Sequence, residues 1–173
     1  MEKGAEVNMA LAGGQYGSAL VAAAGEGETR TVEFLVEKGA KVNMALVGGQ
    51  YGSALAAAAG GWGGTEIVEF LVEKGAEVNM ALAGGQYGSA LAAAVYGGWT
   101  EVVEFLVEKG AKVNMALAGG RYGSALAAAA YWGWKVNVEA LIKAGAAVNP
   151  RLKNGRLSTA LRAVQEDLLA EDV

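Results

Sequence analysis

The strongest constraint in the sequence is a block of about 35 residues that is written four times with few changes. The stretch NMALAGGQYGSALAAA begins at Asn79, and close copies begin at Asn8, Asn43 and Asn114. Successive copies are 35 or 36 residues apart, and a fifth, degenerate copy reads GRLSTALRAV from Gly155. A period of this size predicts a solenoid of small supersecondary units. Each unit stacks on its neighbours because it cannot bury its apolar face alone.

The unit that begins at Ser89 shows how each block is expected to fold. The Ser89 hydroxyl can cap an alanine-rich first helix, which Gly97–Trp99 then ends. Thr100 can cap a second helix with an apolar stripe through Leu106. Gly110 ends that helix, and a glycine-rich β-hairpin loop leads into the next copy. The sequence therefore predicts an all-α solenoid of helix–turn–helix units with projecting β-hairpin loops.

The same pattern gives the expected boundaries of the units and helices. One domain, 1–173, divides into units at approximately 1–12 (partial), 13–47, 48–83, 84–118, 119–153 and 154–173 (partial, or a cap). First helices are expected to begin near Ser18, Ser53, Ser89, Ser124 and Thr159, and second helices near Thr29, Thr65, Thr100 and Val136.

Composition argues against most kinds of chemistry. The chain has no Cys, hence no thiolate nucleophile or Cys-bound metal, and no His, hence no imidazole base or His-bound zinc. The net charge is −4 and the basic residues are scattered, so no nucleic-acid partner is expected. We therefore predict no catalytic residues, no cofactor and no metal site. Enzyme activity has little support.

Hydropathy gives no reason to expect a membrane partner. The longest apolar runs are rich in alanine and fall short of the ~20 residues that span a bilayer. The N-terminal MEKGAEVN is charged and has no apolar signal core. A cytoplasmic location is therefore expected.

The segment GSALAAAVYGGWTEVVEFLVEKGAKVN resembles the ankyrin repeat. In that family T-P-L-H opens the first helix, G-H ends it and L-L-L-x-x-G-A-D-V-N closes the second. The YG-x-AL motif, which follows a Gly-Gly pair, is most similar to ankyrin arrays of fungal proteins. The near-identity of the copies would also fit a consensus or de novo design. Here Ser89–Ala92 stands in place of T-P-L-H, and Trp99 stands in place of the His. Both departures remove hydrogen bonds that the family uses, so softer repeats are expected.

The resemblance implies a protein partner that binds the concave surface formed by the hairpin tips and the first helices. Transfer by position selects Gln15, Gln50, Gln86 and Arg121 at the tips, and Tyr96, Tyr131 and Trp132 at the ends of first helices. Trp134 is added because it lies where the copies differ. Tyr and Trp supply large contact areas and concentrate in binding hot spots. The alternative is that Tyr96 and Tyr131 only cover the small alanine core of the adjoining unit.

Two other functions remain open from the sequence. The array could enclose a small apolar ligand in a groove lined by alanines, and could even act on it as an enzyme without histidine. It could also be a structural array, because similar units with poorly capped ends can stack head to tail.

The invariant letters predict packing between units. The tyrosines Tyr16, Tyr51, Tyr87 and Tyr122 recur with the fold and are expected to pack between repeats. Trp62 and Trp99 are expected to fill the turn between the two helices. Alternating Met and Leu on the hairpin arms either pack on neighbouring arms or form an exposed apolar strip.

Overall fold

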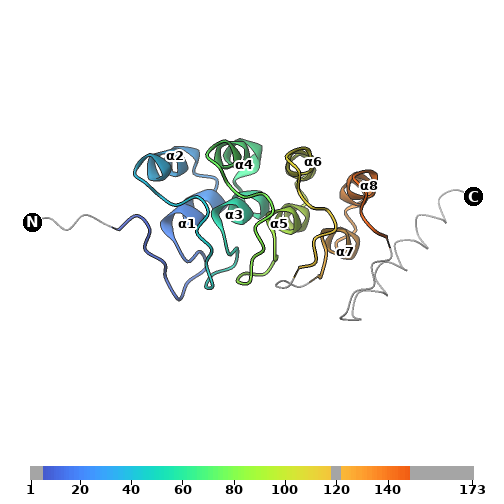
Figure 1. Ribbon diagram of the computed structural model, residues 1–173, viewed down its shortest axis with the longest axis horizontal. Helices are drawn as coiled ribbons and strands as arrows, with labels where there is room; N and C mark the ends of the chain where they lie inside the picture. Colours follow the sequence, from blue (N-terminus) through green and yellow to red (C-terminus); the bar gives the residue numbers. More distant parts are fainter. Residues whose placement is uncertain (1–5, 118–121, 149–173) are drawn as a thin grey trace, which may run out of the picture.

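Eight helices lie in two rows in the part of the chain that the computed structural model describes, residues 6–117 and 122–148 (Figure 1). One row holds the first helix of each unit and the other holds the second, and loops extend away from the first row. The first helices are α1 (Ala19–Gly25), α3 (Ala54–Gly60), α5 (Ala90–Gly97) and α7 (Ala125–Tyr131). The second helices are α2 (Thr29–Glu37), α4 (Gly64–Glu73), α6 (Thr100–Glu108) and α8 (Lys135–Lys143). The prediction of an all-α solenoid is confirmed.

Serine starts each first helix as the sequence predicts. The hydroxyl of Ser53 accepts the backbone N–H of Ala56 at 3.2 Å, and the other three N-cap serines make the equivalent bond. The predicted start at Thr159 lies outside the described residues. The second helices begin at or within one residue of the predicted positions.

The prediction that Thr100 caps the second helix is wrong. Thr100 is the first residue inside α6, and Trp99 occupies the N-cap position without a side-chain hydrogen bond. The Thr100 hydroxyl instead donates to Oδ1 of Asn137 on α8, at 2.7 Å. Asn137 stands where the second and third units have the apolar residues Ile67 and Val102. It is 1% exposed, and its amide nitrogen has no partner among the described residues.

The loops project as predicted, but the described residues form no β-strands. Each loop is closed by one main-chain hydrogen bond, such as that from Leu46 N–H to the Gly52 carbonyl at 2.8 Å. Adjacent loops lie so close that a Cβ added to Gly84 would be 2.2 Å from the Leu46 carbonyl oxygen. The backbones of neighbouring loops therefore pack directly against each other. This packing holds the loops in place without a ladder of β-sheet hydrogen bonds within each loop.

The core is built from small side chains in one row and larger ones in the other. Ala56, Ala57, Ala58 and Ala59 of α3 are fully buried, between α1 and α5. Leu71, Leu106 and Leu141 are fully buried on the second helices. Alanine lets the first helices approach one another closely, while leucine fills the space between the rows.

The asparagine that opens each of the four close copies, at Asn8, Asn43, Asn79 and Asn114, joins its unit to the next. Asn79 Nδ2 donates to the Gly110 carbonyl at 2.9 Å, and its Oδ1 accepts the Lys112 N–H at 2.7 Å. Asn8, Asn43 and Asn114 make the same pair of bonds one unit apart. We call this arrangement the asparagine clamp. The clamp bonds only backbone atoms of the turn after each second helix. The side chains of that turn can therefore change without loss of these hydrogen bonds.

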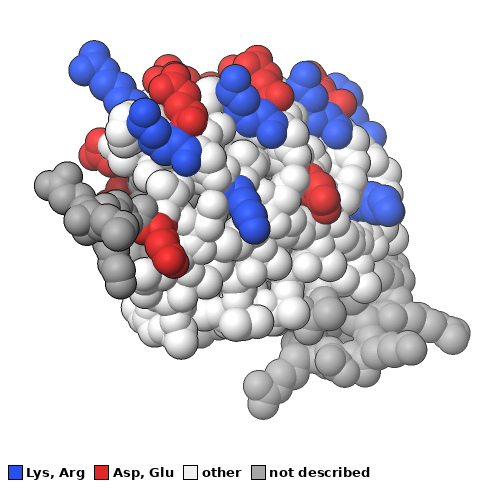
Figure 2. Space-filling model, turned by 60° about the vertical axis from the view of Figure 1, so that its left-hand side comes forward, with Lys and Arg blue, Asp and Glu red and all other residues white. Residues whose placement is uncertain are grey.

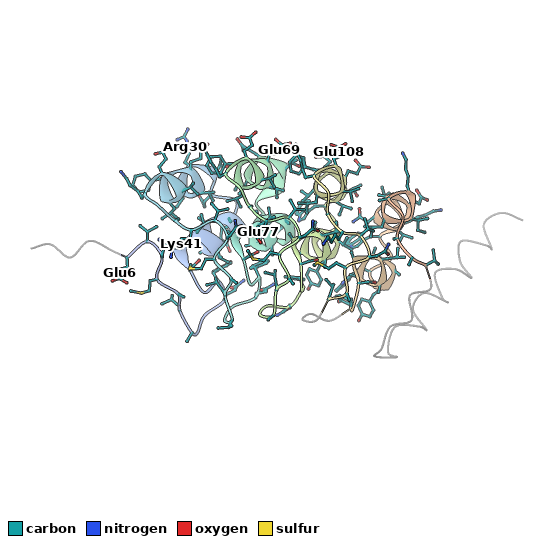
Figure 3. All side chains as sticks on the ribbon, in the orientation of Figure 1. Glu6, Arg30, Lys41, Glu69, Glu77 and Glu108 are labelled. Atoms are coloured by element: carbon teal, nitrogen blue, oxygen red, sulfur yellow. The ribbon has the colours of Figure 1, made fainter. Side chains whose placement is uncertain are left out.

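Charge is confined mainly to the outer row. Figure 2 shows acidic and basic side chains gathered over the second helices. Lys38, Lys74 and Lys109 each place their ammonium 5.2–5.4 Å from the centre of a phenylalanine ring one helical turn earlier. A separate row on the arms alternates in sign, and Figure 3 labels its first three members, Glu6, Lys41 and Glu77.

Replacing Asn79 with alanine should lower the free energy of unfolding by about 1–3 kcal/mol, because two interunit hydrogen bonds are lost together. Urea unfolding followed by far-ultraviolet circular dichroism measures the change. Glu104→Ala on the exposed side of α6 is the matched control, and should change stability by less than ~0.5 kcal/mol. Equal losses in the two variants would show that the clamp contributes nothing beyond an ordinary surface residue.

Candidate functional site

Seven aromatic rings form a continuous row where the loops meet the first helices. Neighbouring ring centres are 4.8–6.1 Å apart, within the usual range for aromatic pairs. In order of contact the row is Tyr16, Tyr51, Tyr87, Tyr96, Trp132, Tyr131 and Tyr122. We call it the aromatic row. It combines the repeat tyrosines, predicted to be structural, with three aromatic residues that were predicted to bind.

The repeat tyrosines form the buried part of the aromatic row, as predicted. Tyr51, Tyr87 and Tyr122 are buried, and Tyr16 at the first unit is half-buried. Tyr87 accepts a hydrogen bond from Nε2 of Gln50 at 2.8 Å, and Tyr16 donates to the Glu26 carboxylate. The Tyr122 hydroxyl is buried without a partner among the described residues.

Burial of these phenols alters their acidity. Burial raises the pKa of Tyr87 to about 12, although the hydrogen bond from Gln50 opposes the shift. The hydrogen bond to Glu26, which favours the neutral phenol, raises the pKa of Tyr16 to about 12. The aromatic row is therefore built for uncharged tyrosines.

Three members of the aromatic row are open to solvent and form a cluster at the ends of α5 and α7. Tyr131 is 57% exposed, Trp132 is 40% exposed and Tyr96 is half-buried. The Trp132 ring stands nearly perpendicular to both tyrosines, at 87° to Tyr96 and 84° to Tyr131. We call these three residues the exposed cluster. The first two units have Gly25 and Gly60 where the later units have Tyr96 and Tyr131, so the cluster belongs to the third and fourth units only.

The predicted glutamines come together at the loop tips. Gln50 N–H donates to the Gln15 carbonyl at 2.7 Å, and Gln86 N–H donates to the Gln50 carbonyl at 2.8 Å. The side chain of Gln50 is occupied, because its Oε1 lies 3.4 Å from Nε2 of Gln15 while its own Nε2 bonds Tyr87. Gln15 and Gln86 are exposed. Arg121, the remaining predicted tip residue, lies outside the described residues.

Trp134 does not join the exposed cluster through any ring contact in the described structure. Its ring lies over Gly98 in the turn of the preceding unit, where an added Cβ would be 3.1 Å from the indole. Trp134 thus belongs with Trp62 and Trp99, which meet edge to face at 6.3 Å. Trp62 is 75% exposed, so the expectation that it fills the turn between helices is wrong.

The alanines of α3, α5 and α7 do not line an open groove. All alanines of α3, α5 and α7 are buried. The expectation of an alanine-lined groove for a small apolar ligand therefore lacks the surface that it needs in these helices.

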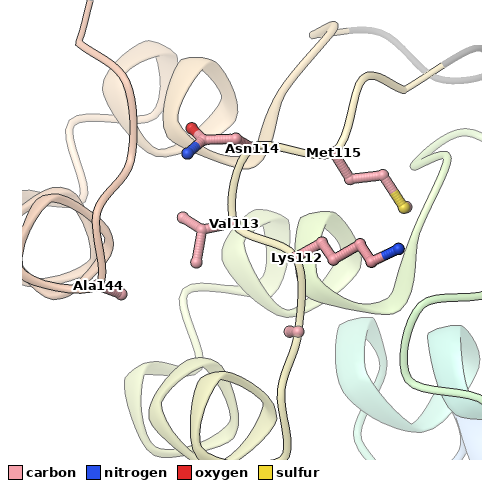
Figure 4. Close-up of a pocket in the computed structure, with 6 residues that line it drawn as sticks. Lys112, Val113, Asn114, Met115 and Ala144 are labelled. Carbon is pink, nitrogen blue, oxygen red and sulfur yellow. The ribbon is translucent and has the colours of Figure 1, made fainter.

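A hollow of about 420 Å³ lies elsewhere, beside the arm that follows α6 (Figure 4). Its lining residues are Ala111, Lys112, Val113, Asn114, Met115 and Ala144. Asn114 already bonds the Gly145 carbonyl and the Ala147 N–H, so its polar atoms are committed to the fold. The hollow includes none of the predicted site residues.

The Met and Leu residues of the arms behave differently along the array. Leu46 and Leu82 are 4% and 3% exposed, and Leu46 packs against Gly17 of the preceding unit. Leu11 and Met9, in the first arm, are 53% and 52% exposed. The arms therefore pack on one another inside the array, and among the described arms their Met and Leu side chains are most exposed in the first unit.

No group of acidic side chains in the described residues could hold a metal ion. None of the described helices is long and apolar enough to cross a membrane.

Comparison with known families agrees with this geometry. A family model described as ankyrin repeats in three copies matches residues 1–81, and a single ankyrin repeat matches residues 89–116. This chain belongs to the ankyrin repeat family. A search of curated proteins found no match. Ankyrin repeats are generally protein-interaction modules, and helices α7 and α8 continue the ankyrin arrangement beyond the matched residues.

Sequence reasoning missed the asparagine clamp and Asn137. The signal for the clamp was present in this ankyrin array, since an Asn opens all four close copies. The conformation of the loop does not itself require an Asn there, so its recurrence indicates that the side chain makes a contact. The signal for Asn137 was a polar residue in the apolar stripe of a second helix.

The buried tyrosines make stability fall in strong alkali. Because Tyr87 has a higher pKa folded than unfolded, its contribution is complete below about pH 10 and is lost as the pH rises toward about 12. Urea unfolding at a series of pH values across this window should show the decline. The Tyr87→Phe variant removes the titrating group, and its decline should be shallower. An identical pH dependence in both proteins would contradict the assignment.

Proposed function

We propose that this ankyrin array binds a protein partner on its concave face, and that the exposed cluster of Tyr96, Tyr131 and Trp132 is the centre of contact. The observation that carries the proposal is the exposure of the Tyr131 and Trp132 rings, in contact with half-buried Tyr96, beside the buried alanines of α5 and α7. Exposed large aromatic residues that lie together usually mark contact sites, and Tyr and Trp dominate binding energy in such sites.

The rest of the aromatic row supports the exposed cluster from beneath. Tyr96 contacts buried Tyr87 at 4.8 Å, and Tyr131 contacts buried Tyr122 at 5.2 Å. Each exposed tyrosine thus rests on a ring that the fold holds in place. A partner would meet rings that are already positioned, which lowers the entropy cost of binding.

Replacing Tyr131 and Trp132 together with alanine should abolish partner binding while the fold is retained. Each lost hot-spot contact is expected to cost about 2–4 kcal/mol of binding energy. The experiment captures proteins from a lysate of the source cell on the wild-type chain and on the variant, and compares the bound sets by mass spectrometry. Circular dichroism checks that the helices remain.

Trp62→Ala is the matched control, because Trp62 is a more exposed tryptophan outside the aromatic row. Partners that are retained by Trp62→Ala and lost from the double variant support the proposal. Partners that bind the double variant as well as the wild type would overturn it.

A second candidate function is head-to-tail stacking of two copies, and one observation favours it. Leu11 and Phe34 of the first unit are 53% and 55% exposed, whereas the equivalent Leu46 is buried by the preceding unit. Inside this array, the surface that corresponds to the one around Leu11 is covered by the preceding ankyrin unit. A second copy of the chain supplies such a unit.

Leu11→Gln should reduce self-association if this stacking occurs. Sedimentation velocity over a range of concentrations measures the mass, which should rise with concentration in the wild type and rise less in the variant. Val47→Gln changes another exposed apolar residue, 91% exposed on an internal loop, and should behave as the wild type. A wild-type chain that stays monomeric throughout would exclude the stacking.

A further inference from the structure

We propose that the exposed cluster of Tyr96, Tyr131 and Trp132 recognises an uncharged, proline-rich segment in the polyproline II conformation. This inference rests on the proposed function, because it names the chemistry of the partner that the same face would bind. Three properties of the described structure support it: the lack of charge, the lack of a strand edge or helix groove, and the arrangement of the rings.

The described part of the concave side offers almost nothing to a charged ligand. The described loops and first helices carry no charged residue within 9–25, 44–63, 80–99, 113–117 and 122–134. Glu26, which follows α1, is bonded to Tyr16 at the other end of the aromatic row. A charged segment placed on the exposed cluster would lose hydration without gaining a counter-charge. The face therefore favours an uncharged segment.

Two common modes of peptide binding have no place on this side. Addition of a strand needs a free sheet edge, whereas the described residues contain no strand and the loop tips of Gln15, Gln50 and Gln86 bond one another. Docking of an amphipathic helix needs a wide apolar groove, whereas all alanines of α3, α5 and α7 are buried. Recognition must then use exposed side chains.

The rings suit a polyproline segment in particular. Trp132 stands between Tyr96 and Tyr131, nearly perpendicular to both, with ring centres 5.2 and 5.3 Å away. Such rings present adjoining aromatic surfaces against which pyrrolidine rings can pack, as in the aromatic-lined grooves that bind this conformation. The polyproline II helix is already extended in solution, so little conformational entropy is lost on binding.

Hydrogen bonding is complementary as well. A proline segment presents carbonyl oxygens but no N–H groups. The exposed cluster and the adjoining tip offer donors in the Trp132 indole, the Tyr131 hydroxyl and the exposed Gln86 amide. The ligand, which offers carbonyl acceptors and no N–H donors, would thus meet hydrogen-bond donors on the protein.

The test titrates a blocked decaproline peptide into the full chain, with binding measured by calorimetry and by the indole N–H resonances in nuclear magnetic resonance spectra. The expected result is saturable binding that shifts the Trp132 resonance. Trp132→Ala should weaken binding at least about tenfold, whereas Trp62→Ala should leave it unchanged. A blocked glycine–serine peptide of equal length should not bind.

Failure to bind decaproline, equal binding of the glycine–serine peptide, or an equal loss in Trp62→Ala would each overturn this inference. The capture experiment separates it from the proposed function. If decaproline does not bind but the Tyr131→Ala, Trp132→Ala double variant still loses its captured partners, only the proline-rich chemistry is wrong. If decaproline binding depends on Trp132 but captured partners ignore the double variant, the ligand chemistry stands and the proposed function fails.

Discussion

The asparagine clamp is the interaction on which the rest of the array depends. Each clamp spans two units, and it bonds backbone atoms on either side of the turn after a second helix, as Asn79 does with Gly110 and Lys112. It sets how far one unit lies from the next. That spacing in turn brings the loops into backbone contact, puts the tyrosines within 5.7–6.1 Å along the first three units, and buries Leu46 under Gly17. A change in the clamp would therefore disturb the aromatic row as well as the core.

Invariant and variable residues cooperate in the aromatic row. The sequence suggests that repeat tyrosines are scaffold and that Tyr96, Tyr131 and Trp132 form a separate site. The structure connects them ring by ring, with Tyr87 under Tyr96 and Tyr122 under Tyr131. The repeated residue thus positions the variable one. This arrangement lets units that share a scaffold differ in what they present, because a single substitution at the end of a first helix changes the surface without changing its support.

Much of the fold followed from local rules, and most of what did not follow depends on contacts between units. Ser53 and Gly110 act as the cap and the stop that their residue types predict, because those interactions lie within a few residues. The loops were expected to be β-hairpins, and they are instead held by neighbouring loops, which no single unit reveals. Trp134 shared a variable stretch with Trp132, yet it lies over Gly98 of the previous unit. Side-chain direction at such positions is decided by the adjoining repeat.

Backbone spacing also explains why the exposed cluster is restricted to the third and fourth units. Gly60 occupies the position of Tyr96 in the second unit, and a Cβ added there would lie 3.0 Å from both the Cβ and the carbonyl oxygen of Ala93. The second unit carries one extra residue in its Gly60–Gly64 turn, and Trp62 N–H bonds the Gly25 carbonyl of the first unit at 2.8 Å. A side chain at position 60 would thus have to push α3 away from α5. The glycine that permits this close packing disfavours an aromatic residue in the second unit, so the binding surface that we propose is asymmetric along an otherwise regular array.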